Sequence, residues 1–157
     1  MSPSPVRKST ARDEKIVNLG VRLLSPIDRW IYRVTGGNRK FRILGRGKAE
    51  ALLLTTIGRK SGQSRTTPLL YLQEGDNVVL AASKGGMPHH PLWYLNLQAN
   101  PQVEVEFGTK KIAMVARQAS AGEKAHLWPR LVEIYPSYAT YQTLTDRDIP
   151  VLILTPR

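Results

Sequence analysis

The chain has 157 residues, 41% of them hydrophobic, and is long enough to bury the core of one domain. It contains no cysteine, which excludes disulfides, thiolate nucleophiles, iron–sulfur clusters and cysteine zinc sites. No apolar run approaches the roughly 20 residues of a membrane span, and no signal-peptide pattern opens the chain, so we expect a cytoplasmic protein.

Positive charge is concentrated in the N-terminal third of the chain. The net charge is +11 overall and +8 within residues 1–50, where 12 Lys and Arg stand against 4 Asp and Glu. Ser, Pro and charged residues dominate residues 1–12, which we expect to be disordered. Residues 13–48 are predicted to form a basic amphipathic helical segment and a linker, because apolar residues recur at helical spacing from Ile16 to Val34. This segment either contacts an anionic membrane surface, as a peripheral protein on the inner face of the cell membrane, or packs on the folded domain.

Residues 49–157 are predicted to form one mainly β domain. Runs of β-forming residues between turn residues predict strands at 51–57, 65–72, 77–82, 103–107, 111–118 and 148–154. Helices are predicted at 92–98 and 120–134, the second with Ser120 and Glu123 at capping-box spacing. Antiparallel strands with a few flanking helices indicate an α+β fold built on a small barrel or rolled sheet.

Two polar turns that follow apolar runs carry the strongest functional signal. The first, within Thr55–Leu69, combines glycines, hydroxyl groups and three cations. Glycines free backbone N–H groups and hydroxyls add donors, so the turn predicts a cradle for a phosphorylated or carboxylated ligand. The second, Ala82–Gly86, leads into a helical pattern whose N-terminus could face the same anion. We expect the two turns to form one shared site.

Six segments in this order resemble the deazaflavin-dependent nitroreductase family, whose members use coenzyme F420. They are Leu52–Gly62, Ser83–Gly86, Pro91–Leu97, Ala99–Pro101, Tyr135–Tyr138 and Thr145–Arg147. The resemblance runs from about residue 51 to the C-terminus and implies a split β-barrel of the FMN-binding-like type, here as a deazaflavin-binding domain. It also implies hydride transfer from reduced deazaflavin to a quinone or nitroaromatic acceptor.

The resemblance places the cofactor-binding residues in both turns and in the helix that follows them. They are Thr55, Gly58, Arg59, Lys60, Ser61, Gly62, Gln63, Arg65, Pro68, Ser83, Lys84, Gly85, Gly86, Trp93 and Asn96. The cations among them would hold the phosphate and acidic tail of the coenzyme through charge-assisted hydrogen bonds. The alternatives are that the cations are solvated turn charges, that Trp93 is a core residue and that Asn96 bonds a neighbouring loop.

Three tyrosines form a second candidate cluster. Tyr135, Tyr138 and Tyr141 are three residues apart, which could direct three phenol groups toward one cavity. An aromatic core stripe is the alternative, although each buried hydroxyl would then need a partner. Because this region lines the substrate pocket in the family, the resemblance makes these tyrosines and Ser83 the catalytic candidates. At Leu70 the family commonly carries an aromatic residue, which places nitroimidazole reduction in doubt.

Three other classes of function were weighed. His89 and His90 are adjacent and His126 is alone, so their spacing does not suit a metal site and none is expected. FMN also carries a phosphate, so an FMN-dependent oxidoreductase of the same barrel fold remains open. A non-enzymatic basic module that binds anions or nucleic acid is the other alternative. Nucleic acid is not expected, because interleaved surface aromatics and known DNA-binding patterns are missing.

Overall fold

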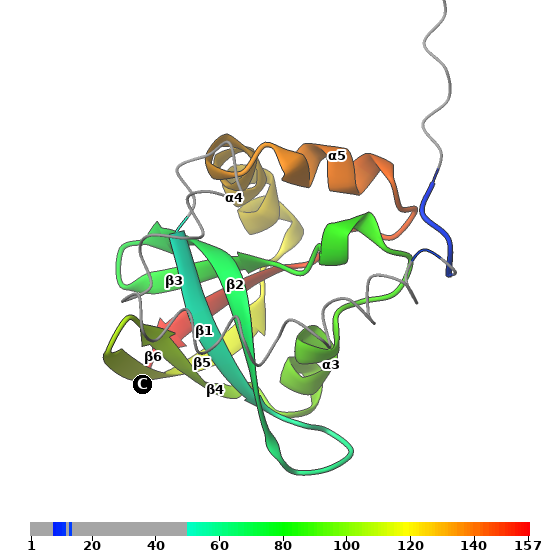
Figure 1. Cartoon of the computed structure of the whole chain (residues 1–157). Helices are drawn as coiled ribbons and strands as arrows, with labels where there is room; N and C mark the ends of the chain where they lie inside the picture. Colours follow the sequence, from blue (N-terminus) through cyan, green and yellow to red (C-terminus); the bar gives the residue numbers. More distant parts are fainter. Residues whose placement is uncertain (1–7, 12, 14–49) are drawn as a thin grey trace, which may run out of the picture.

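The computed structural model describes residues 8–11, 13 and 50–157 of the chain. At its centre six antiparallel strands form a closed barrel in the order β1-β2-β3-β6-β5-β4 (Figure 1). The strands are β1 (Glu50–Ile57), β2 (Ser64–Glu74), β3 (Asn77–Ala81), β4 (Gln102–Phe107), β5 (Lys110–Gln118) and β6 (Val151–Pro156). The helical segments are η1 (Lys84–Gly86), α3 (Leu92–Ala99), α4 (Ala121–Ile134) and α5 (Ser137–Thr143).

The predicted antiparallel barrel with a few flanking helices is confirmed, and the first five strands start within one residue of the predicted positions. The last strand begins at Val151, where it pairs with Ala81 of β3, and not at residue 148. Ile149 instead donates its N–H to Gln142 Oε1 at 3.0 Å. Pro150 has no N–H to add to a ladder, so regular pairing starts after it.

The strand alternation divides the core into two layers. Val78 and Leu80 of β3 join the cluster inside the barrel, to which α3 adds Trp93 and other side chains. The intervening residue Val79 belongs to a second cluster, shared with Leu131 of α4. Side chains that alternate along a strand point to opposite faces of the sheet, so β3 contributes to both layers.

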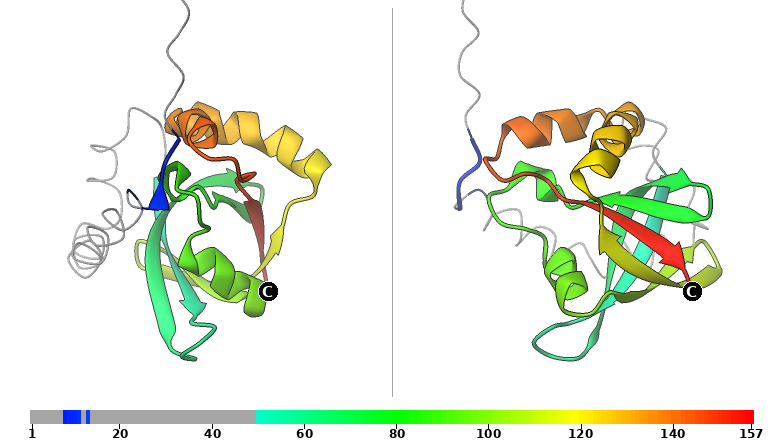
Figure 2. Two further views of the ribbon diagram at one scale, coloured as in Figure 1. Left: turned by 90° about the vertical axis from the view of Figure 1, so that its right-hand side faces the viewer. Right: turned by 180° about the vertical axis from the view of Figure 1, so that it is seen from behind.

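Helices α4 and α5 cover the barrel on the side of β3 and β6 (Figure 2). The predicted capping box begins α4: Glu123 N–H donates to Ser120 Oγ at 3.3 Å, and Ser120 N–H donates to a Glu123 carboxylate oxygen at 2.8 Å. The helix ends before Pro136, and α5 starts as a separate short helix. This break changes the direction of the chain in the middle of the tyrosine cluster.

The described N-terminal residues lie against the loop between α5 and β6. Ser9 donates its backbone N–H to the Leu144 carbonyl at 2.9 Å, and Lys8 forms an ion pair with Asp146. The remaining residues of the predicted disordered N-terminus, and nearly all of the basic segment predicted at 13–48, lie outside the described residues. No helix in the described part of the chain is long and apolar enough to cross a membrane.

Candidate functional site

A pocket of about 450 Å³ lies between β2, the turn around Ser83, the start of α3 and the tyrosines near α5. Its volume is that of a typical small-molecule site. Its lining comprises Thr67, Pro68, Leu69, Leu70, Ala81, Ser83, Lys84, Gly85, Pro91, Leu92, Trp93, Tyr135, Tyr138 and Tyr141. All four residues predicted to be catalytic therefore border one pocket, together with predicted cofactor-binding residues from β2, the second turn and α3.

The turn at Ser83–Gly86, which we call the serine turn, has an unusual backbone. Lys84, Gly85 and Gly86 follow one another with φ values of 46°, 61° and 75°. Lys84 has a side chain, so its left-handed conformation is strained and must be maintained by its surroundings. Gly86 is required for space: a Cβ at this position would lie 2.6 Å from the Tyr141 carbonyl oxygen. The serine turn is therefore packed directly on α5.

One arginine from a distant part of the chain holds this turn. The guanidinium of Arg147 donates to three backbone carbonyls, those of Met87 at 2.9 Å, Ala82 at 3.0 Å and Ser83 at 2.6 Å. Arg147 was not among the residues predicted for the site. Its sequence position in the Thr145–Arg147 motif marks the residue, but it does not indicate which carbonyl groups the side chain bonds.

His90 is a fourth acceptor for the same guanidinium. Its Nδ1 lies 3.3 Å from Arg147 Nη1, and because a guanidinium can only donate, we assign the imidazole as neutral with its proton on Nε2. The ring also packs against Tyr94, with 4.7 Å between the ring centroids. Burial, followed by the charge of Arg147, lowers the pKa of His90 below its ordinary value.

The three tyrosines form one hydrogen-bonded and stacked cluster. The Tyr135 and Tyr141 hydroxyls lie 3.1 Å apart, and the rings of Tyr135 and Tyr138 meet edge to face at 5.1 Å. Burial raises the pKa of Tyr138 well above its ordinary value, and it raises the pKa of Tyr141 to about 12. Both phenols therefore keep their protons at neutral pH and can donate hydrogen bonds toward the pocket.

The first turn forms an exposed loop between β1 and β2, and most of its amides are already engaged. Gly58 N–H donates to the Gln63 carbonyl at 2.8 Å, and Gly62 N–H donates to the Gly58 carbonyl at 2.7 Å. Ser61 N–H also bonds the Gly58 carbonyl, and Gln63 N–H bonds the Ser61 hydroxyl. The expectation that glycines free these N–H groups for an anion is therefore wrong. Only the side chains of Arg59, Lys60 and Arg65 give this loop its positive charge.

Asn96 of α3 fixes the position of this loop. Its side chain is 5% exposed, and its Oδ1 accepts from the N–H of Arg59 at 3.2 Å and from Arg59 Nη1 at 3.3 Å. Its Nδ2 donates to Thr56 Oγ1 at 3.1 Å. Asn96 thus bonds a neighbouring loop, as the alternative interpretation proposed.

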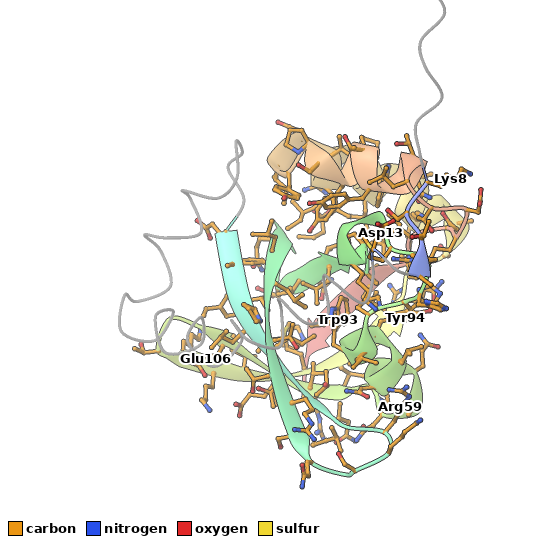
Figure 3. All side chains as sticks on the ribbon, turned by 45° about the vertical axis from the view of Figure 1, so that its right-hand side comes forward. Lys8, Asp13, Arg59, Trp93, Tyr94 and Glu106 are labelled. Carbon is orange, nitrogen blue, oxygen red and sulfur yellow. The ribbon has the colours of Figure 1, made fainter. Side chains whose placement is uncertain are left out.

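Helix α3 connects the loop to the pocket. Trp93 borders the pocket and is 7% exposed, so it is at once a core residue and a wall of the site. Asn96 lies three residues further along, about 4.5 Å along the helix axis. Figure 3 shows Trp93 at one end of α3 and Arg59 near the other. The two turns therefore border a common region, although the loop from Gly58 to Arg65 lies outside the pocket lining and only Thr67, Pro68 and Leu69 of the first segment line it.

Several predicted cofactor residues lie outside the pocket lining. They are Thr55, Gly58, Arg59, Lys60, Ser61, Gly62, Gln63, Arg65, Gly86 and Asn96. Thr55 faces Thr66 across the strands, with 2.8 Å between the two hydroxyl oxygens, and Arg65 donates to Gln63 Oε1 at 3.0 Å. Within residues 8–11, 13 and 50–157 there is no group of three or more His, Asp or Glu side chains that could hold a metal ion.

The chain is similar in sequence to proteins of one known family. Residues 25–156 match the model of the F420H(2)-dependent quinone reductase family. The F420H(2)-dependent quinone reductase Rv1261c of Mycobacterium tuberculosis is 43% identical over 143 residues, which cover 89% of this chain and 94% of the relative.

Two solved structures share the fold at high sequence identity. The F420-H2 dependent reductase FDR-A is 48% identical, with a TM-score of 0.62 over 66% of this chain and 92% of its own. A structure described as a domain-swapped dimer is 40% identical, with a TM-score of 0.64 over 86% of this chain and 98% of its own. By sequence and by fold, the chain belongs to the F420H(2)-dependent quinone reductase family.

Proposed function

We propose that this protein is an oxidoreductase that binds coenzyme F420 and uses its reduced form to reduce a quinone in the pocket beside the serine turn. The observation that carries the proposal is that this pocket lies next to a cationic loop. Helix α3 connects the two, because Trp93 lines the pocket and Asn96, one turn further along, bonds Arg59 of the loop. The relatives named above are F420H(2)-dependent reductases, which supports the same assignment.

The described residues suit such a coenzyme. When bound, reduced F420 supplies the hydride, so the protein needs no redox-active side chain. We assign contact with the deazaflavin to the apolar wall around Trp93 and Pro68, and contact with the phosphate and acidic tail to Lys60, Arg65 and Lys84. Cations are suited to this task because hydrogen bonds between charged groups are roughly twice as strong as neutral ones. Arg59 is partly engaged by Asn96, so its main contribution is to hold the loop.

The acceptor side of the pocket is built to donate hydrogen bonds. Tyr138 and Tyr141 remain protonated, and the Ser83 hydroxyl makes no capping hydrogen bond to its own turn. These groups would donate hydrogen bonds that stabilise the negative charge developing on a quinone oxygen, while the proton that completes the reduction comes from solvent. Leu69 and Leu92 make the rest of the wall apolar, which suits a quinone ring.

Coenzyme titration tests the proposal. The double variant Lys60→Ala with Lys84→Ala should raise the dissociation constant for F420 about tenfold or more, because each charged hydrogen bond contributes roughly 1.5–3 kcal/mol. A double variant of Lys110 and Lys111 to Ala is the matched control, since it removes two cations from the β4–β5 hairpin. Tight binding of FMN in place of F420, or an unchanged dissociation constant in the first variant, would contradict the assignment.

Two finer proposals concern the acceptor and the membrane. We infer that nitroaromatic compounds are adventitious acceptors, and Leu70 in the pocket lining places an aliphatic side chain where the family commonly has an aromatic one.

We also propose that the basic segment at residues 13–48 contacts an anionic membrane surface, where each cation contributes about 1 kcal/mol. Sedimentation with anionic vesicles at low salt tests this contact, and protein that stays in the supernatant would contradict it.

A further inference from the structure

We propose that Arg147 is a positioning residue for the reaction: its guanidinium holds the serine turn in the conformation that presents Ser83 to the pocket. This inference rests on the proposed function, because it assigns Ser83 a role in quinone reduction. Arg147 does not line the pocket, so it would act through the turn and not through contact with substrate.

The guanidinium bonds both ends of the turn. The carbonyls of Ala82 and Ser83 stand at its start and the carbonyl of Met87 at its end, all within 3.0 Å of Arg147 nitrogens. A planar guanidinium presents its N–H groups in a fixed fork, so three carbonyls bonded to one fork cannot move independently of one another.

The turn has little stability of its own. Its internal backbone bonds are two, from Gly86 N–H to the Ser83 carbonyl at 3.0 Å and from Met87 N–H to the Lys84 carbonyl at 3.1 Å. Gly85 and Gly86 adopt positive φ without strain, but the φ of 46° at Lys84 is disfavoured for a residue with a Cβ. A strained conformation of this kind persists only where its surroundings determine it, and Arg147 supplies that constraint.

Arg147 is itself held by the tyrosine side of the pocket. Gln142 of α5 donates its side-chain amide to the Arg147 carbonyl at 2.9 Å, and the Arg147 N–H donates to Thr145 Oγ1 at 3.3 Å. Gly86 touches the same helix from the other direction, against the Tyr141 carbonyl. The guanidinium therefore joins the wall that carries Ser83 to the wall that carries Tyr141, and it fixes the spacing between their hydroxyl groups.

Hydrogen exchange tests the constraint without any substrate. Arg147→Lys keeps the charge but not the fork, and Arg147→Gln removes the charge as well. In both variants the amides of Gly86 and Met87 should exchange about tenfold faster or more, because the bonds to charged groups that close the turn are lost. Amides of β4 should keep their protection. The control is Arg117→Gln, which removes an arginine bonded at 2.7 and 2.8 Å to the exposed Glu123. Unchanged exchange at Gly86 and Met87 in Arg147→Lys would overturn the proposal.

A double-mutant cycle then tests whether the turn matters through Ser83. Ser83→Ala and Arg147→Lys should each lower kcat for quinone reduction about tenfold, and the double variant should be no slower than the slower single variant. Losses that multiply would mean that Arg147 acts independently of Ser83, and a normal kcat in Ser83→Ala would remove Ser83 from the reaction; either result overturns the positioning role. Absence of F420-dependent activity in the unmodified protein would instead contradict the proposed function, while the exchange experiment would still decide whether Arg147 fixes the turn.

Discussion

The two turns that border the site are held in opposite ways. The loop from Gly58 to Arg65 is closed by its own backbone bonds and anchored at one point by Asn96. The serine turn has few internal bonds and is held by Arg147, which is 64 residues from Ser83 in the sequence. The exposed loop is thus suited to present cations to solvent, whereas the buried turn depends on the rest of the fold for its shape. A polar turn in the sequence therefore does not reveal whether its conformation is local in origin.

The largest expected effect on stability comes from the glycines of the serine turn, where two substitutions distinguish steric overlap from backbone strain. Gly86→Ala places a Cβ 2.6 Å from a carbonyl oxygen at a φ of 75°, so overpacking and strain together should lower the free energy of unfolding by about 3 kcal/mol or more. Gly85→Ala, at a φ of 61° with nothing within 4 Å of the added Cβ, should cost about 1–2 kcal/mol. Urea unfolding of the two variants measures the difference. Equal losses would show that α5 yields to the added methyl group and does not constrain the turn.

A smaller effect is expected at the anchor of the Gly58–Arg65 loop. Asn96→Ala removes three hydrogen bonds of a buried side chain, and the free energy of unfolding should fall by about 2 kcal/mol. Affinity for F420 should fall with it, because the cations lose their fixed position. Gln98→Ala, at an exposed position of the same helix, is the control. If Asn96→Ala also accelerates amide exchange in the serine turn, the two turns are not held separately.

The smallest effect concerns pH and should appear at the serine turn alone. Because the pKa of His90 is lowered from 6.5 in the folded protein, the unfolded chain binds more protons at pH values just below 6.5. The free energy of unfolding should therefore decrease as the pH falls through and below that value, and His90→Gln should reduce this decrease. Protonation would also place a cation against Arg147, so the protection factor of the Gly86 amide, which corrects for the intrinsic pH dependence of exchange, should fall in acid. The protection factors in the Gly58–Arg65 loop should stay unchanged. Parallel stability profiles for the two proteins would contradict the assignment of a neutral His90.

The parts of the fold that the sequence predicted are those with local causes. The run of β-forming residues at 103–107 indicated β4, and the spacing of Ser120 and Glu123 indicated the start of α4, because both signals reside in neighbouring residues. The three-residue spacing of the tyrosines predicted their convergence on one pocket, although Tyr135 follows the end of α4 and only Tyr138 and Tyr141 lie on α5.

The parts that could not be predicted depend on tertiary contacts. The partners of Arg147 lie 57 to 65 residues away, and no local pattern indicates which carbonyls it bonds. The amides of the Gly58–Arg65 loop were expected to be free because glycine permits such geometry, yet the loop satisfies them internally. Glycine content indicates which backbone conformations are accessible. The conformation that is adopted depends on which backbone N–H and C=O groups find hydrogen-bond partners in the folded protein.

The placement of α5 has an evolutionary consequence under the proposed function. This helix of seven residues carries Tyr138 and Tyr141, lies outside the barrel ladder and contributes no strand pairing. The cationic loop, by contrast, belongs to the β1–β2 hairpin that builds the sheet. Substitutions in α5 can therefore alter the acceptor that a member of this family reduces without rebuilding the barrel or its coenzyme side. Diversification of acceptors among proteins of this fold would proceed through the pocket-facing side chains of this helix, whose backbone and Gln142 stay fixed against the serine turn.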